Sequence, residues 1–237
     1  MLIYPDSPEA REHASHVVRS GGLVAFRTDT FYGVGADPFN PSALELINTL
    51  KGRDGKPILV LAADIRDAER LVATRTRAFD ILAASHWPGA LTLVAAARAE
   101  VPELLTAGTG TIGVRLPDDE ECRSIVRACG GLLTAGTGTV GVRLPDDAEA
   151  RAIVRACGGL LTATSANPAG RPPARMAAEV AAYFPDGPGL VIDGGATRTE
   201  LPSTVIDVTG PKPRLIREGV ITREELEETL RAAGIDF

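Results

Sequence analysis

Residues 104–131 read LLTAGTGTIGVRLPDDEECRSIVRACGG, and residues 132–159 read LLTAGTGTVGVRLPDDAEARAIVRACGG. The two stretches differ only at the pairs Ile112/Val140, Glu120/Ala148, Cys122/Ala150 and Ser124/Ala152. Each unit predicts a loop of glycine and threonine, a strand over Gly-Val-Arg-Leu, and a helix that begins at Pro-Asp-Asp and ends at Gly-Gly. A strand followed by a helix is typical of the α/β class.

A third Leu-Leu-Thr-Ala begins at Leu160 and continues as Thr-Ser-Ala-Asn. An unequal recombination at this shared phrase would copy one unit and leave the flanking sequence unchanged. Solenoid proteins also repeat at this length, but they need at least about three units and extend through the domain. We therefore interpret the repeat as a local tandem duplication, and the fold has to accommodate one additional strand and helix.

Outside the repeat, predicted helices and strands alternate along the chain. The patterns predict helices over residues 9–19, 42–50, 77–85, 175–184 and 223–233, and strands over residues 23–26, 57–62 and 90–95 and near Leu190 and Thr204. Such alternation indicates helices packed on a sheet. No Ser/Gly-rich linker interrupts it, so we expect residues 1–237 to form one domain.

The composition is typical of a globular protein. Of the 237 residues (24.8 kDa), 44% are hydrophobic and 24% are charged. No stretch approaches the roughly 20 apolar residues that span a bilayer, and the first residues lack the basic start and apolar run of a signal peptide. We therefore expect a cytoplasmic protein with no membrane segment.

The charge balance favours small anionic ligands. The formal net charge is −6 and the pI is about 5.2, whereas sequence-independent binding of nucleic acid needs a broad basic surface. Cys122, Cys129 and Cys157 are expected to be free thiols, because the last two are copies of one position. His13 and His16 lack the further ligands of a metal site.

Both repeat units contain Gly-x-Gly-x-x-Gly, beginning at Gly108 and Gly136. In a dinucleotide-binding fold these glycines follow a strand and open a helix. Here the next residues are Val-Arg-Leu-Pro, which predict a strand. The context therefore excludes a dinucleotide site.

Several polar phrases have both a structural and a functional interpretation. Lys51-Gly52-Arg53 places two cations at a helix C-terminus, where they are favourable, but Lys and Arg also clamp phosphates. TDTFYGVG at Thr28 follows a strand, where α/β proteins often bind ligands, and could equally form a turn. The phrases around Ser165, Ser203 and Arg217 are each compatible with ordinary turns, strand starts and solvated cations.

Taken in order, these phrases resemble the YrdC-like family of threonylcarbamoyl-AMP synthases. The matches are TDTFYGVG at Thr28, KGR at Lys51, KPI at Lys56, WPGALT at Trp87, VRLP in both repeats, SAN at Ser165, PSTV at Pro202 and IREG at Ile216. Any one motif is weak, but eight in order are specific. The resemblance covers nearly the whole chain apart from one repeat unit. It implies an α/β fold with an open twisted sheet of mixed strand direction and flanking helices.

The resemblance also implies roles for the matching residues. ATP would be bound by Lys51, Arg53, Ser165, Asn167 and Arg217, of which the first two are the catalytic candidates. L-Threonine would be bound by Thr30 and Ser203. The Arg of Val-Arg-Leu-Pro would bind the threonine carboxylate, and the Thr four residues before it would lie near ATP.

The duplication makes that last assignment ambiguous between Thr111 with Arg115 and Thr139 with Arg143. The second copy continues without interruption into the Ser-Ala-Asn phrase, so we assign Thr139 to ATP and Arg143 to threonine. The argument for the first copy is that it keeps the native approach of the chain, because residues 101–103 precede it directly.

The implied reaction joins L-threonine, bicarbonate or CO2, and ATP, and releases pyrophosphate, for N6-threonylcarbamoyladenosine modification of tRNA. ATP would be a substrate accompanied by Mg²⁺, with no tightly bound cofactor and no protein metal ligands. A separate tRNA-modifying transferase complex would receive the adenylate. Cations and hydroxyls without a Cys–His or Ser–His pair agree with catalysis by alignment and charge neutralisation.

Two other classes of function stay open. One is an RNA-binding or regulatory module, although the acidic pI argues against more than weak RNA binding. The other is a catalytically inactive protein that binds ATP and threonine, with its site displaced by the additional unit. The presence of Lys51, Arg53, Ser165 and Asn167 favours the enzyme.

Overall fold

The computed structural model describes residues 1–52, 57–62, 65–115, 136–137, 139–140, 160–162, 164–197 and 199–237. Their strands form two larger sheets. The five-stranded sheet has the order β1 (Leu2–Pro5), β11 (Leu190–Asp193), β2 (Val24–Phe26), β3 (Gly33–Gly35) and β10 (Thr164–Ser165). The six-stranded sheet has the order β13 (Arg214–Arg217), β12 (Thr204–Asp207), β5 (Leu91–Ala96), β6 (Thr111–Arg115), β4 (Val60–Ala62) and β9 (Leu160–Thr162).

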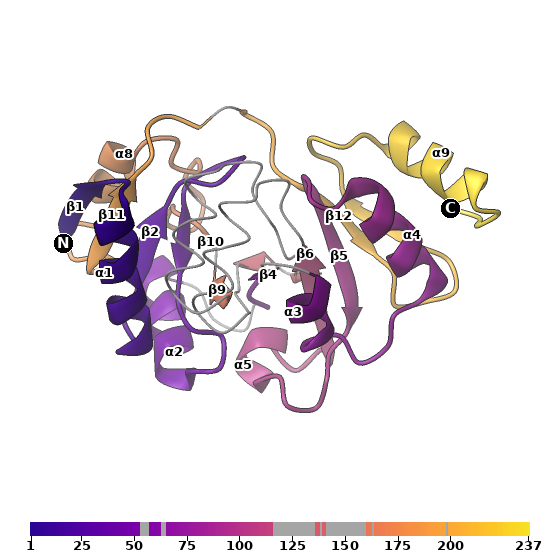
Figure 1. Ribbon diagram of the computed structural model, residues 1–237, viewed down its shortest axis with the longest axis horizontal. Helices are drawn as coiled ribbons and strands as arrows, with labels where there is room; N and C mark the ends of the chain where they lie inside the picture. The colour runs from indigo at the N-terminus through magenta and orange to yellow at the C-terminus, as the bar shows by residue number, and fades with distance from the viewer. Residues whose placement is uncertain are drawn as a thin grey trace.

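The mixed α/β class is confirmed, because both sheets contain parallel and antiparallel pairs. Where the resemblance implies one open sheet, hydrogen bonding instead defines two. The sheets meet where the chain passes from β9 into β10. There the Thr162 amide donates to the Ala36 carbonyl at 2.7 Å, and its hydroxyl donates to the Val34 carbonyl at 3.2 Å. Figure 1 shows β2 and β11 in the left half of the molecule and β5, β6 and β12 in the right half.

Five of the described helices lie close to their predicted positions, whereas two short helices, over residues 65–69 and 103–106, were not predicted. In chain order the helices are α1 (Pro8–Arg19), α2 (Pro41–Lys51), α3 (Ile65–Glu69), α4 (Arg77–His86), α5 (Glu103–Thr106), α8 (Ala177–Tyr183) and α9 (Arg223–Ala232). Four of them begin after a residue whose side chain accepts a backbone N–H, which satisfies one of the orphan donors at a helix start. These N-caps are Ser7, Asn40, Thr76 and Thr222.

Helices cover both faces of the five-stranded sheet. Along β2, Val24 and Phe26 pack in one apolar cluster with residues of α1, whereas Ala25 packs in a second cluster with residues of α2 and α8. Successive side chains of a strand point to opposite faces, so a strand buried on both faces is apolar throughout. This explains why β2 reads as a continuous apolar run rather than an alternating one.

Strands β1, β3 and β13 are among the observed strands that were not predicted from the sequence. The side chains of β1 are all exposed at a sheet edge, so no apolar alternation marks them. Strand β3 is short and rich in glycine, and β13 carries two arginines. In each case pairing with a neighbouring strand, rather than side-chain pattern, defines the strand.

The two repeat units differ in their strands. The strand of the first copy, β6, is central in the six-stranded sheet, antiparallel to β5 and parallel to β4. In the second copy the structure describes β7 (Gly136–Thr137) and β8 (Thr139–Val140), which pair with each other. The predicted helices of both copies lie outside the described residues.

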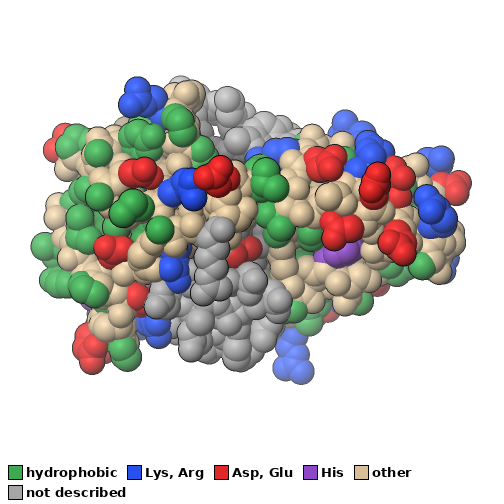
Figure 2. Space-filling view, turned by 90° about the horizontal axis from the view of Figure 1, so that it is seen from above, with side chains coloured by type: hydrophobic (Ala, Val, Ile, Leu, Met, Phe, Trp, Pro, Cys, Tyr) green, Lys and Arg blue, Asp and Glu red, His purple; other side chains and the backbone are tan. Residues whose placement is uncertain are grey.

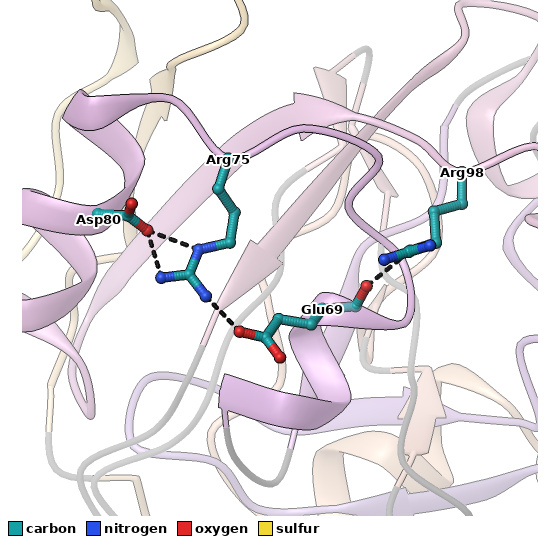
Figure 3. A network of polar contacts seen from close by, with 4 residues as sticks. All are labelled: Glu69, Arg75, Asp80 and Arg98. Atoms are coloured by element: carbon teal, nitrogen blue, oxygen red, sulfur yellow. Dashed lines mark hydrogen bonds and ion pairs between the residues drawn. The ribbon is translucent and has the colours of Figure 1, made fainter.

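A polar network joins the periphery of the six-stranded sheet (Figure 3). Arg75 pairs with Glu69 of α3 and donates from Nε to Asp80 of α4 at 2.6 Å. The Nε of Arg98, just after β5, donates to the Glu69 carbonyl at 2.7 Å. The side chains are largely exposed, so the network orders these segments more than it stabilises the fold.

The surface seen in Figure 2 differs between its two ends. Basic and acidic side chains are interspersed over the end that carries α4 and α9, whereas apolar side chains gather at the opposite end. Exposed apolar residues at the latter end include Met1, Leu2, Ile3 and Tyr4. Among the described residues, no helix is long and apolar enough to cross a membrane.

Candidate active site

Lys51 is placed by the end of α2. The helix ends at Gly52, whose φ of 59° is in the left-handed region, and the Gly52 amide bonds back to the Asn48 and Thr49 carbonyls. The Lys51 side chain is only 5% exposed. Its ammonium donates to the backbone carbonyl of Ser165 and lies 3.5 Å from the Ser165 hydroxyl. Two predicted ATP-binding residues are therefore in contact, while Arg53 lies outside the described residues.

The Ser-Ala-Asn turn is held from both sides. The Ala166 amide donates to the Tyr32 carbonyl at 2.7 Å. The side-chain amide nitrogen of Asn167, Nδ2, donates to the Arg171 carbonyl at 2.6 Å. The Asn167 Oδ1 atom is buried and has no hydrogen-bond partner among the described residues. Because buried polar atoms are nearly always paired, this oxygen is suited to accept a bond from a ligand.

The loop after β2 is closed by Thr28 and fastened by Tyr32. The Thr28 hydroxyl donates to the Phe31 carbonyl at 2.5 Å, and Thr30 is only 2% exposed. The Tyr32 hydroxyl lies 3.1 Å from Asp193 Oδ1 and 2.8 Å from the Gly195 carbonyl. Burial, reinforced by the Asp193 charge, raises the pKa of Tyr32, so its hydroxyl remains a neutral donor. The Tyr32 hydroxyl thus fastens the predicted threonine loop to the end of β11, and the Tyr32 carbonyl, which accepts the Ala166 amide, connects the same loop to the turn that carries Asn167.

Ser203 and Arg217 form a second polar group. Arg217 donates from Nε and Nη2 to the Ser203 carbonyl at 3.2 and 2.9 Å, and Nη2 lies 3.3 Å from the Ser203 hydroxyl oxygen. Burial lowers the pKa of Arg217, but a guanidinium keeps its charge in proteins. The predicted ATP residue Arg217 is therefore in contact with the predicted threonine residue Ser203.

The sequence interpretation did not assign Thr92. This residue is fully buried in β5, and its hydroxyl donates to the Ser203 hydroxyl oxygen at 3.2 Å. It belongs to the phrase WPGALT, which was used only to recognise the family resemblance. A threonine between two leucines of a buried strand is a local signal that could have drawn attention to it.

The two polar groups belong to different sheets. Lys51 contacts β10 of the five-stranded sheet, whereas Ser203 directly precedes β12 of the six-stranded sheet. Three passages of the chain connect the sheets: from β3 through α2 to β4, from β9 to β10, and from β11 to β12 across the top of Figure 1. The candidate residues therefore come from both halves of the molecule.

The assignment to Thr139 and Arg143 stays a prediction, and the described residues offer an observation in support of the alternative, Thr111 and Arg115. Val114 pairs with Leu93 of β5, so the next residue, Arg115, falls at the level of Thr92. Thr139 lies in a two-residue strand outside both larger sheets, and Arg143 lies outside the described residues. Because the two copies have nearly identical sequences, local preference does not distinguish them, and pairing with β5 and β4 is what places β6 in the sheet.

Metal ligands do not cluster in the described part of the chain. Within those residues, no group of three or more His, Cys, Asp or Glu side chains is arranged to hold a metal ion.

Comparisons with known proteins agree with this architecture. The model of the Sua5/YciO/YrdC family, described as "Telomere recombination", matches residues 16–137 and again residues 131–219. Each match contains one complete copy of the repeat. The family pattern is therefore interrupted where the duplicated units join.

Individual relatives are named threonylcarbamoyl-AMP synthase. The threonylcarbamoyl-AMP synthase of Pyrococcus abyssi is 33% identical over 218 residues, which covers 92% of this chain and 56% of that protein. That of Marinobacter nauticus is 31% identical over 204 residues, 85% of this chain and 93% of that protein. The chain spans little more than half the length of some curated relatives, such as those of Pyrococcus abyssi and Bacillus subtilis.

The solved structures show the same relationship. The crystal structure of Pyrococcus abyssi Sua5 complexed with L-threonine superposes with a TM-score of 0.82 at 30% identity, over 97% of this chain and 61% of that one. From the family model, the relatives and the shared fold, the chain belongs to the Sua5/YciO/YrdC family.

Proposed function

We propose that this protein is an L-threonylcarbamoyladenylate synthase, which forms threonylcarbamoyl-AMP and pyrophosphate from L-threonine, bicarbonate or CO2, and ATP. The observation that carries the proposal is the contact of the buried Lys51 ammonium with the Ser165 turn. It puts a cation beside polar groups suited to a nucleotide, in a chain whose relatives are named as this synthase.

The chemistry needs positioning rather than a protein nucleophile. The threonine amine adds to CO2 and loses a proton, which gives a carbamate. A carbamate oxygen then attacks the α-phosphorus of ATP, a P–O bond to the leaving group breaks, and pyrophosphate departs. Aligning the reactants and neutralising the phosphate charge are the main contributions open to the protein.

The residues divide into two groups by charge and position. On the ATP side we assign Lys51, Arg53, Ser165, Asn167 and Arg217, with Mg²⁺ accompanying the triphosphate as its counter-ion. On the threonine side we assign Thr30 and Ser203. From the repeat we now assign Thr111 to ATP and Arg115 to the threonine carboxylate, because their strand occupies the sheet.

The product implies a partner. Threonylcarbamoyl-AMP is a mixed anhydride, which transfers its acyl group readily and hydrolyses in water. We propose that a separate tRNA-modifying transferase complex accepts it. Any direct contact of this chain with RNA would be weak, because the net charge of −6 opposes it.

The test is release of pyrophosphate from ATP in bicarbonate buffer, with and without L-threonine. We expect threonine-dependent release, and loss of at least about 100-fold in Lys51→Ala, since removing one group that stabilises developing charge typically costs that much. Lys212→Ala is the matched control, because the Lys212 side chain is 69% exposed. It should retain full activity.

Other outcomes would point to other functions. Binding of ATP and threonine without pyrophosphate release would indicate an inactive relative. Salt-sensitive tRNA binding without turnover would indicate an RNA-binding module. Equal activity of the Lys51→Ala and Lys212→Ala variants would contradict the assigned site.

A further inference from the structure

The Ser203 hydroxyl has both of its acceptor positions occupied. A serine hydroxyl carries one donor hydrogen and two acceptor lone pairs. The Thr92 hydroxyl donates to Ser203 Oγ at 3.2 Å, and Arg217 Nη2 approaches the same atom at 3.3 Å. A guanidinium can only donate. With both lone pairs engaged, the Ser203 hydrogen has to point away from Thr92 and Arg217.

Thr92 is held in place by the sheet. In β5, Leu91 and Leu93 belong to the main apolar cluster, so Thr92 between them faces the opposite side. Strand β12 runs parallel to β5, with Val205 paired to Thr92 and the Thr204 amide bonded to the Ala90 carbonyl at 2.9 Å. This pairing fixes the start of β12, and with it Ser203, beside the Thr92 hydroxyl.

Arg217 is equally constrained. At Gly219, an added Cβ would lie 2.1 Å from the Pro202 carbonyl oxygen, so only glycine lets this segment pack against residues 202–203. The Thr204 hydroxyl oxygen accepts the Gly219 and Ile221 amides, each at 3.0 Å. These contacts hold the end of β13 against the start of β12 and keep the guanidinium on Ser203. Neither donor to the Ser203 hydroxyl is therefore free to turn away.

We infer that Thr92 is a positioning residue that turns the Ser203 hydroxyl into a fixed hydrogen-bond donor toward L-threonine. The inference rests on the proposed function, which places Ser203 in the threonine pocket. A fixed donor selects an acceptor, so Ser203 would bind a carboxylate or hydroxyl oxygen of the amino acid and not its ammonium group. The adjacent Arg217 charge favours the same choice, because it attracts oxygen and repels ammonium.

The test compares one substitution that removes the Thr92 hydroxyl with one that retains it. Thr92→Val replaces the hydroxyl by a methyl group of similar shape and frees one Ser203 lone pair. We expect the Kd for L-threonine, measured by calorimetry, to rise about 10-fold, the typical effect of one hydrogen bond. Thr92→Ser retains the hydroxyl and should restore the Kd to within about 3-fold of the unmodified protein. The KM for ATP should not change in either variant.

Thr106→Val is the matched control, because it removes another buried hydroxyl, which donates to the Glu103 carbonyl within α5. It should affect stability but not the Kd for L-threonine. An unchanged Kd in a folded Thr92→Val protein would overturn the inference. So would equal weakening in Thr92→Val and Thr92→Ser, since that would mean packing alone matters.

The proposed function and this inference can fail separately. If the unmodified protein binds L-threonine but releases no pyrophosphate, the proposed activity is wrong, and the Thr92 comparison still decides the inference. If pyrophosphate release depends on threonine but the variants bind it equally, only the inference is wrong. If the unmodified protein binds no L-threonine even with a non-hydrolysable ATP analogue, both are wrong.

Discussion

Lys51 stands at a helix end and is also the residue to which we assign a role at the ATP phosphates. As the last residue of α2 it occupies the negative end of a helix dipole, the position that cations favour. It is nevertheless buried, and it reaches β10 of the five-stranded sheet, where its ammonium contacts Ser165. The position at the helix end is therefore confirmed, and the interpretation of the Lys-Gly-Arg phrase as a phosphate clamp stays a prediction. Burial in contact with the Ser-Ala-Asn turn is what distinguishes Lys51 from an ordinary cap.

The two repeat copies allow a test at single residues. We expect Arg115→Ala to lower kcat/KM for L-threonine about 100-fold, because it removes the charge proposed to hold the carboxylate. We expect Arg143→Ala to change kcat/KM by less than about 2-fold, as is usual for a residue outside the site. Threonine-dependent pyrophosphate release measures both.

The comparison is internally controlled, because Arg115 and Arg143 stand in the same Val-Arg-Leu-Pro phrase. The reverse pattern would show that the second copy supplies the active-site residue. Equal partial losses would mean that the copies exchange places in the sheet.

Helices α4 and α9 are far apart in the sequence but pack against each other. The α9 helix begins with a capping box, in which Thr222 and Glu225 satisfy each other's backbone amides. It packs beside α4 at the right of Figure 1, where His86 Nε2 lies 3.0 Å from the Thr229 hydroxyl. The sequence predicted both helices but not that they meet through this histidine, because the contact joins distant segments.

The α4–α9 contact should be sensitive to mild acid. Burial lowers the pKa of His86 below its usual value, while the Glu225 carboxylate acts in the opposite direction. A group whose pKa is lowered by folding stabilises the protein above its unfolded pKa of about 6.5, and this contribution is lost as the pH falls through the folded value. We therefore expect the free energy of unfolding to decrease as the pH falls below about 6.5.

Urea denaturation at several pH values measures this effect. His86→Gln cannot titrate and should show a smaller decrease over the same interval. Glu225 also has a lowered pKa, from bonds with Thr222, but its contribution is lost only below about pH 4.5. An identical pH dependence in His86→Gln would show that other groups are responsible.

At the scale of the whole molecule, the two repeat copies are alternatives for one place in the six-stranded sheet. The first copy begins shortly after β5 and its strand pairs with β5 antiparallel. Whichever copy pairs with β5, the additional residues lie in a connecting segment, either after the paired strand or before it, so loop-closure entropy hardly distinguishes the copies. Their nearly identical side chains do not distinguish them either.

Removal of residues 132–159 should therefore leave a folded and active protein. The deletion joins Gly131 to Leu160 and recreates the same Gly-Gly-Leu-Leu-Thr-Ala phrase, with β6 and its Thr111 and Arg115 retained. We expect circular dichroism to show a cooperative unfolding transition and pyrophosphate release to be at least equal to that of the full chain.

The reciprocal deletion of residues 104–131 is the control, because its product differs from the first only at the same four positions. Both products should behave alike. Insoluble protein from both deletions would show that the additional unit has become part of the structure.

The sequence by itself determined the α/β class, most helix positions, the duplication and the order of the family motifs. These depend on local patterns: apolar periodicity, capping residues and short phrases that are legible one segment at a time. It also identified Lys51 and Ser165, whose contact the structure shows.

Only the tertiary structure decided that hydrogen bonding forms two sheets, that the strand of the first copy is central in one of them, and that Thr92 and Arg217 meet at Ser203. Each of these results depends on pairing between residues far apart in the chain. Strand pairing and side-chain contacts across a sheet are set by which segments come together in space. When two copies carry the same local signals, only that long-range pairing can distinguish them.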